Sequence, residues 1–180
     1  TNRVKATSTQ TRLSDLVRRH GKYETSKFEH TEKAHCVLLY LAASILFDSG
    51  KNSTGICIVV RKDSNIPVGA GLGSSAALCV ASSAALLRIT DGISSKCNDA
   101  DLQLVNNWAF CGETLLHGTP SGVDNTVSTY GGAICFRKSQ GGPSNWKRLS
   151  GFPTLNVVVT NTKVPRETRA LVSGVRQLRD

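Results

Sequence analysis

A glycine-rich segment, PVGAGLGSSAAL at residues 67–78, places three glycines at alternate positions and two serines directly behind them. Glycine allows positive φ and lets a ligand approach the backbone closely, because no Cβ stands in the way. The alanines that follow predict a helix, and the free N–H groups of a helix N-terminus favour a phosphate. Ser74 and Ser75 add hydroxyls that can bond a phosphate oxygen or ligate Mg²⁺. A serine N-cap explains one hydroxyl but not three glycines, so the segment predicts a phosphate-binding loop.

The two common phosphate motifs do not fit this loop. The P-loop pattern G-x-x-x-x-G-K-[ST] requires a Lys that is missing after Gly73. The dinucleotide fingerprint G-x-G-x-x-G requires a different glycine spacing, and Asp91 follows a long predicted helix with no second strand before it. The loop is therefore of another class.

Two carboxylates stand downstream in GETLLHGTPSGVDNTVSTYGG, residues 112–132: Glu113 on a predicted helix, and Asp124 in a Gly-rich turn after it. Two acids beside an anion site would normally repel the anion. They make sense together if one holds Mg²⁺ and the other accepts a proton from an alcohol. The alternative is structural, with an Asx turn at Asp124–Asn125 and a solvent-exposed Glu113. Beside the glycine loop, the site is favoured.

A third segment, TNTKVPRETRALVSGVR at residues 160–176, carries Arg166 at a predicted helix start. The helix dipole disfavours a cation there, so we expect Arg166 to hold an acidic side chain or a substrate anion. A surface arginine is the structural alternative, and the segment taken alone favours it.

The elements that position these residues follow from periodicity and turn signals. Apolar residues at helical spacing predict three helices. The first covers 32–47 with Thr31 as its N-cap, and the second covers about 74–88. The third follows a polar connection at 91–99, has Asp99 or Asp101 as its cap and ends at His117–Gly118. The other expected elements are a short helix at 14–19, strands at 55–62, 130–138, 146–150 and 155–163, a turn at 139–145 and a helix at 166–179.

The 180 residues carry 22 basic and 13 acidic side chains, a formal net charge of +9. The basic residues are dispersed, and the densest cluster, VRRHGK at 17–22, has only Tyr23 as an aromatic neighbour. A solvated surface is favoured over a nucleic-acid groove, so no nucleic-acid partner is expected. No apolar run reaches about 20 residues, so no membrane partner is expected, and the polar residues 1–30 are not expected to act as a secretory signal.

Six cysteines form no C-x-x-C pair and have no His at zinc-like spacing. Cys36, Cys57 and Cys79 lie in apolar runs, where cysteine usually behaves as a small hydrophobic residue. A reducing compartment, the cytoplasm or a peroxisome, fits this pattern better than a disulfide scaffold does.

The glycine loop resembles the nucleotide-binding motif P-x-x-x-G-L-G-S-S-A-A of the GHMP kinases, a family that includes galactokinase and homoserine kinase, and it matches at every fixed position. The HGTPSGVDN run followed by a Gly-Gly strand, and the TNTKVPRETRALV segment, are similar to one branch of that family, the mevalonate kinases. The three motifs span residues 67–176, over half of the chain, whereas residues 1–54 add little beyond a helix.

The resemblance implies an α+β GHMP kinase fold. Residues 1–150 would form the N-terminal ATP-binding domain, which resembles domain 2 of ribosomal protein S5 with a left-handed βαβ crossing, incomplete at its N-terminus. Residues 151–180 would begin the C-terminal α+β domain. Two family segments, PGKVILxGEH with its Lys and the glycine-rich GAGGGGC, are not found, so we expect an internal fragment with little turnover of its own.

The resemblance also assigns site residues, one by one. The ATP phosphates would lie on Gly69, Ala70, Gly71, Leu72, Gly73, Ser74 and Ser75. Ser75 and Glu113 would ligate Mg²⁺, and Asp124 would be the catalytic base. Arg166 and Thr168 would lie close to that base. ATP and mevalonate are the expected partners, the product would be the 5-phosphomevalonate of isoprenoid and sterol synthesis, and a homodimer of the full-length enzyme is compatible with the resemblance.

Three other functions compete with this one. Another GHMP small-molecule kinase would use the same loop, but SGVDN and TNTKVPRETRALV argue against it. The protein could also be a catalytically inactive relative that only binds nucleotide, but the intact Ser75, Glu113 and Asp124 argue against that function. A basic RNA-binding module fits the charge and the S5-like fold, but two Trp, three Tyr and five Phe leave few aromatic platforms.

Overall fold

Helices dominate the computed structural model of the chain, which describes residues 28–49, 56–60, 66, 68, 70–137 and 145–160. Its elements are helices α2 (Phe28–Asp48), α3 (Ser74–Ile89), α4 (Asp99–His117) and α5 (Val123–Tyr130), and strands β1 (Ala133–Arg137) and β2 (Asn145–Leu149). Helices together with an antiparallel hairpin make the fold α+β, as expected. The helices expected at 14–19 and 166–179, and most of the turn at 139–145, lie outside the described residues.

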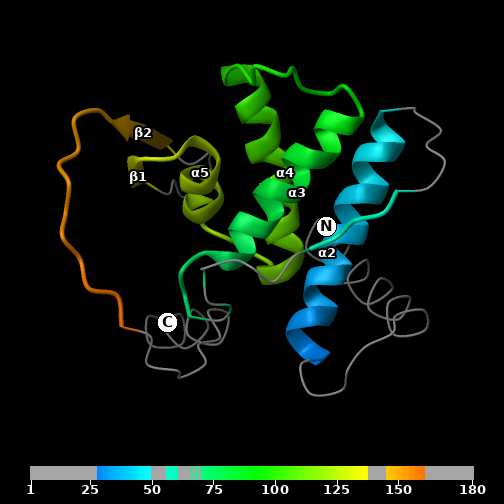
Figure 1. Ribbon diagram of the computed structural model, residues 1–180, viewed down its shortest axis with the longest axis horizontal. Helices are drawn as coiled ribbons and strands as arrows, with labels where there is room; N and C mark the ends of the chain where they lie inside the picture. The colour runs from blue at the N-terminus through cyan, green and yellow to red at the C-terminus, as the bar shows by residue number, and fades with distance from the viewer. Residues whose placement is uncertain are drawn as a thin grey trace, which may run out of the picture.

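Helices α2, α3 and α4 pack against one another, while α5 lies against α3 and α4 on the side away from α2 (Figure 1). The core between them is apolar because one stripe of each helix faces its neighbours. Its buried members are Val37, Leu41, Ile45, Cys79, Leu86, Leu87, Ile93, Val105, Ala109 and Leu115. The three helices expected from periodicity are thus confirmed. None of the helices in the described ranges has both the length and the apolar stretch needed to cross a bilayer.

Two helix starts differ from expectation. Helix α2 begins at Phe28, so Thr31 lies within it and is not its N-cap, because no proline or glycine interrupts residues 28–31. Helix α4 has Asn98 as its N-cap: the Asn98 side chain accepts from the N–H of Asp101, and the Asp101 carboxylate accepts from the N–H of Asn98. The expectation that Asp99 or Asp101 caps α4 is therefore wrong, since Asp101 acts from the third helical position of a capping box.

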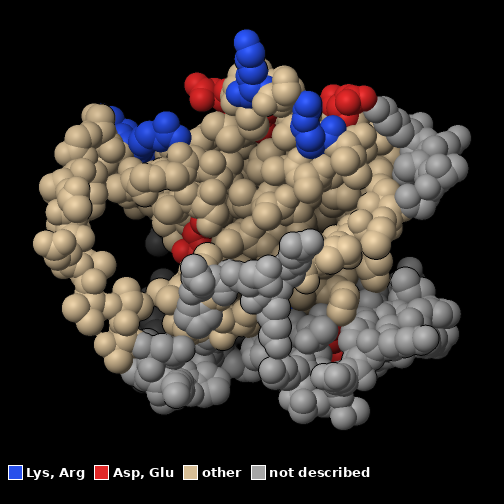
Figure 2. Space-filling model, viewed as in Figure 1, with Lys and Arg blue, Asp and Glu red and all other residues tan. Residues whose placement is uncertain are grey.

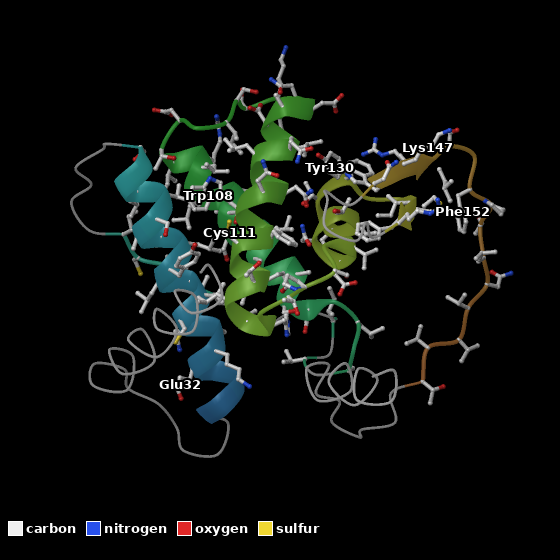
Figure 3. All side chains as sticks on the ribbon, turned by 180° about the vertical axis from the view of Figure 1, so that it is seen from behind. Glu32, Trp108, Cys111, Tyr130, Lys147 and Phe152 are labelled. Atoms are coloured by element: carbon white, nitrogen blue, oxygen red, sulfur yellow. The ribbon has the colours of Figure 1, made fainter. Side chains whose placement is uncertain are left out.

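The hairpin extends from the end of α5. β1 pairs antiparallel with β2, with Ala133 opposite Leu149, which confirms the strands expected at 130–138 and 146–150 in their central residues. Tyr130, the last residue of α5, lies beside this hairpin in Figure 3. Its ring centroid is 4.5 Å from that of Trp146, and its carbonyl accepts a hydrogen bond from Arg148 at 2.6 Å. These contacts attach the sheet to the helices.

Two apolar runs that predict strands have no strand pairing in the part of the chain that the structure describes. Residues 56–60 and 155–160 are exposed, with Val59 74% and Val158 95% exposed, and Cys57 is exposed rather than packed as a small hydrophobic residue. Figure 3 shows Phe152, three residues before the second run, on a trace leading away from the helices. A β-branched run suits a strand, but a strand forms only where another segment pairs with its backbone.

The contact between α3 and α4 depends on Gly112. A Cβ at this position would lie 2.9 Å from Sγ of Cys79 and 3.4 Å from both Cβ of Cys79 and Cγ1 of Val37. Gly112, Cys79 and Val37 are all buried, so none of these atoms can move into solvent. A glycine here lets the two helices pack at their present separation.

Gly112→Ala is expected to lower the free energy of unfolding by up to about 2 kcal/mol. Overpacking a core costs about 1–3 kcal/mol, and the better helix propensity of alanine offsets about 1 kcal/mol of that. Urea unfolding followed by circular dichroism measures the loss. In a Cys79→Ala background the cost should shrink, because the nearest atom is gone; an equal cost in both backgrounds would contradict this account of the crossing.

Candidate active site

The glycine loop leads directly into α3. Gly71 and Gly73 have φ of +75° and +72°, a left-handed conformation that favours glycine. Gly73 is the N-cap of α3 and supplies no side-chain acceptor, so the serine N-cap considered as the plain alternative does not occur. The first N–H groups of α3 consequently lack an N-cap side chain to bond. Of the loop residues expected to hold phosphate, Gly69 lies outside the described residues, and the others surround this helix start.

Ser75, Glu113 and His117 meet beside the first turn of α3. Nε2 of His117 lies 3.3 Å from Oγ of Ser75 and 3.7 Å from Oε2 of Glu113. Glu113 and His117 share one face of α4 because they are four residues apart. The sequence predicts His117 only as part of a helix stop. The four-residue spacing from Glu113 is the signal that could have placed it in the site.

Glu113 is buried, with 3% of its surface exposed, so the solvent-exposed alternative is wrong. Sγ of Cys79 donates to its Oε1 at 3.8 Å, and no Lys or Arg of the described residues forms an ion pair with it. Burial raises the pKa of Glu113 and Asp124 raises it further, while His117 and the Ser75 hydroxyl act in the opposite direction. A buried carboxylate without a strong cationic partner is costly, and such groups concentrate at functional sites.

Asp124 lies in the first turn of α5, not in the Gly-rich turn or the Asx turn considered from the sequence. The helix forms because Gly122, with φ of +86°, reverses the chain as its N-cap, and because Asn125 and Thr126 are buried. The side chain of Asp124 is exposed. Its Cβ is 4.0 Å from where a Cβ on Gly73 would lie, so the start of α5 stands against the glycine loop.

The assembled site therefore joins two helix N-termini, those of α3 and α5, with two carboxylates in different surroundings. Helix N-termini favour an anion. Glu113 is buried and has a raised pKa, whereas Asp124 is exposed, and unlike environments let two carboxylates take separate roles. Arg166 and Thr168 lie outside the described residues, so their expected place near Asp124 stays a prediction.

The donor atoms suit Mg²⁺ held jointly with a phosphate. The described residues contain no group of three or more His, Cys, Asp or Glu that would enclose a metal. Mg²⁺ prefers oxygen ligands, and it usually takes one or two from the protein and the rest from water and substrate phosphates. The Glu113 carboxylate and the Ser75 hydroxyl, which share His117 as a neighbour, offer such a partial set.

Comparison with known proteins gives two findings. The family model described as GHMP kinases N terminal domain matches residues 34–132. Curated mevalonate kinases are similar to the chain: that of Homo sapiens is 52% identical over 122 residues, 63% of this chain and 30% of the relative. The Arabidopsis thaliana protein is 47% identical over 121 residues, which cover 64% of this chain and 31% of that protein. The Schizosaccharomyces pombe protein is 39% identical over 166 residues, which cover 89% of this chain and 40% of that protein. The matches thus span about a third of each relative's length.

The pH dependence of stability tests the burial of Glu113. A carboxyl whose pKa is higher in the folded protein than in the unfolded chain contributes stability that is present in full below the unfolded pKa. That contribution is lost as the pH rises through the folded pKa. Metal-free Glu113→Gln should therefore lose less stability than the wild type when the pH is raised from about 4 to about 8.

Thermal melting in a chelating buffer across this range measures the effect. Asp99→Asn is the matched control, because Asp99 is an exposed carboxylate on the same helix. Parallel pH profiles for the wild type and Glu113→Gln would show that Glu113 is ionised at no cost to the fold.

Proposed function

Because the chain belongs to the GHMP kinase family, we propose that the whole protein transfers the γ-phosphoryl group of ATP to the 5-hydroxyl of mevalonate. The meeting of Glu113 and Asp124 at the glycine-loop end of α3 is the observation that carries this proposal. The similarity to curated mevalonate kinases supports the choice of substrate. The product would be 5-phosphomevalonate.

In this proposal the glycine loop holds the nucleotide. The N–H groups at the start of α3 would bond the ATP phosphates, since they lack an N-cap side chain and carry the positive end of the helix dipole. The absence of a Cβ at Gly71 and Gly73 would let phosphate oxygens approach the backbone. Gly69, Ala70, Leu72 and Ser74 complete the proposed loop.

Ser75 and Glu113 are proposed to hold Mg²⁺, which would neutralise charge on the transferring phosphoryl group. Mg²⁺ binding would remove the disadvantage of a buried Glu113 anion, because the cation supplies the partner that no described Lys or Arg provides. The Ser75 hydroxyl and the Glu113 carboxylate already lie within 3.3 Å and 3.7 Å of the same atom, Nε2 of His117, which supports a shared role.

Asp124 is proposed as the base. The substrate hydroxyl oxygen would attack the γ-phosphorus, its proton would pass to the Asp124 carboxylate, and the bond from phosphorus to the ADP oxygen would break. Being exposed at the start of α5 beside the loop, Asp124 can reach a second substrate that Glu113 cannot. Arg166 and Thr168 are proposed to support it from the segment after residue 160.

The proposal extends to the domain boundary, the cellular compartment and the assembly of the protein. We place the boundary between the N-terminal and C-terminal domains at residue 150, in support of which β2 ends at Leu149 and residues 151–160 are exposed. The cytoplasm or a peroxisome is the proposed compartment, and a homodimer is the proposed assembly. The described Lys and Arg side chains on the face shown in Figure 2 stand apart along its upper edge, which favours a small-molecule substrate over RNA.

Asp124→Asn in the full-length protein should reduce turnover with mevalonate by about 10²–10⁴-fold, because general base catalysis contributes on that scale. The affinity for MgATP should change little. A coupled assay of ADP release and calorimetry with ATP measure the two quantities. Asp99→Asn serves as control, since Asp99 is also an exposed carboxylate in the first turn of a helix. Full activity of Asp124→Asn would remove the proposed base, and activity on another alcohol in place of mevalonate would favour a different GHMP kinase.

Ser75→Ala should weaken nucleotide binding in the presence of Mg²⁺ and leave metal-free binding nearly unchanged, since only the metal contact is lost. Calorimetry with and without Mg²⁺ makes the comparison. Ser82→Ala is the matched control, being a half-buried serine two turns further along α3. An equal loss of affinity with and without the metal would assign Ser75 to the phosphate and not to Mg²⁺.

A further inference from the structure

A buried pair of asparagines joins α4 to α5 beside the site. Asn125, in the first turn of α5, is 2% exposed, and Asn106 of α4 is 8% exposed. Nδ2 of Asn125 donates to Oδ1 of Asn106 at 2.7 Å and to the carbonyl oxygen of Asn106 at 3.4 Å. Nδ2 of Asn106 donates to Oγ1 of Thr126 at 3.5 Å. The amide of Asn125 is therefore supplied with acceptors, as a buried amide requires.

Most of the hydrogen bonds that α5 makes to α4 gather on Asn106, which bonds Asn125, Thr126 and Thr129, and the Asn125 bond is the shortest of them. The helix is only eight residues long, and helices of that length are marginal without tertiary contacts. Its buried residues, Asn125 and Thr126, are both polar. Apolar packing is non-directional, whereas a buried hydrogen-bonded pair selects one register and one orientation. The amide pair thus decides how α5 is rotated on α4.

The rotation of α5 in turn decides where Asp124 lies. Asp124 directly precedes Asn125, and its Cβ is within 4.0 Å of the Cβ position of Gly73. A turn of the helix about its axis would carry the carboxylate away from the glycine loop. Asn106 and Glu113 are seven residues apart on α4, so they lie two turns apart on one face. One helix therefore places Glu113 directly and Asp124 through the amide pair.

We propose that Asn125, anchored by Asn106, is a positioning residue that holds Asp124 against the glycine loop. The inference rests on the proposed function, in which Asp124 is the base. Asn125 itself is buried, and its side chain bonds Asn106. Its contribution is geometric, and a misplacement of about 1 Å at a reacting group can cost on the order of 10²-fold in rate.

The kinetic test uses Asn125→Ala in the full-length protein. We expect kcat to fall by roughly 10- to 100-fold, with KM for ATP changed by less than about twofold, because the proposed ATP contacts come from α3 and its loop and not from the side chain of Asn125. In the double variant, the factor by which Asn125→Ala lowers kcat should not multiply the factor for Asp124→Asn, since both changes remove the same function. A double variant that is slower than Asp124→Asn by the full single-variant factor would overturn the proposal.

Two control variants separate positioning from general damage. Gln103→Ala removes another α4–α5 hydrogen bond, the one that the Tyr130 hydroxyl donates at 3.0 Å, but at the exposed far end of α5. Val105→Ala opens a cavity in the core of α4, next to Asn106, without touching the amide pair. Both should keep kcat within about threefold below their melting temperatures. A loss of kcat in Val105→Ala equal to that in Asn125→Ala would reduce Asn125 to a structural role.

Hydrogen exchange tests the same inference without turnover. In Asn125→Ala the amides of α5 should exchange at least about tenfold faster than in the wild type, while those of α3 stay unchanged. Unchanged exchange in α5 would overturn the proposal whatever the kinetics show. If α5 exchanges faster but the wild type does not phosphorylate mevalonate, the proposed function fails and the anchoring of α5 by Asn125 stands.

Discussion

The close contact of α3 and α4 at Gly112 is the constraint on which the site depends. With a Cβ position 2.9 Å from Sγ of Cys79 and 3.4 Å from Val37, no larger residue fits without displacing buried atoms. Glu113 is the next residue, so the same contact carries its carboxylate into the interior beside the start of α3. A buried acid opposes stability, and a fold that retains one here has a use for its charge. In the proposed function the glycine loop supplies that use, because it would hold a phosphate together with its Mg²⁺ at the start of α3.

Around this contact the electrostatics are arranged by helix ends. The N-termini of α3 and α5 both begin after a left-handed glycine, Gly73 or Gly122, and both bring partial positive charge to the site. The C-terminal turn of α4 brings partial charge of the opposite sign, to which the Glu113 carboxylate adds. This arrangement offers adjacent places for an anion and a cation, which the proposed phosphoryl transfer from a metal–nucleotide complex requires.

The sequence is sufficient for the long helices and for the left-handed backbone of the glycine loop, because 3.6-residue periodicity and alternate glycines are local signals. The sequence does not predict α5, because VDNTVSTY combines β-branched residues with Asp and Asn. The helix is held by the hydrogen bond from Asn125 to Asn106, which lies 19 residues earlier in the chain. The sequence also fails at 56–60 and 155–160 because propensity specifies an extended chain but not the partner that would make it a strand. The burial of Glu113 and the part played by His117 depend on how α3 meets α4, which no single segment encodes.

The central claim is that Ser75 and Glu113 hold a metal at the start of α3 while Asp124 faces the second substrate. A crystal structure of the full-length protein with Mg²⁺, a non-hydrolysable ATP analogue and mevalonate tests it most directly. The account predicts Ser75 Oγ and a Glu113 carboxylate oxygen at about 2.1 Å from Mg²⁺, phosphate oxygens on the first N–H groups of α3, and the Asp124 carboxylate within hydrogen-bond distance of the 5-hydroxyl. A nucleotide bound elsewhere, or a metal coordinated without Glu113 while that carboxylate stays against His117, would contradict it.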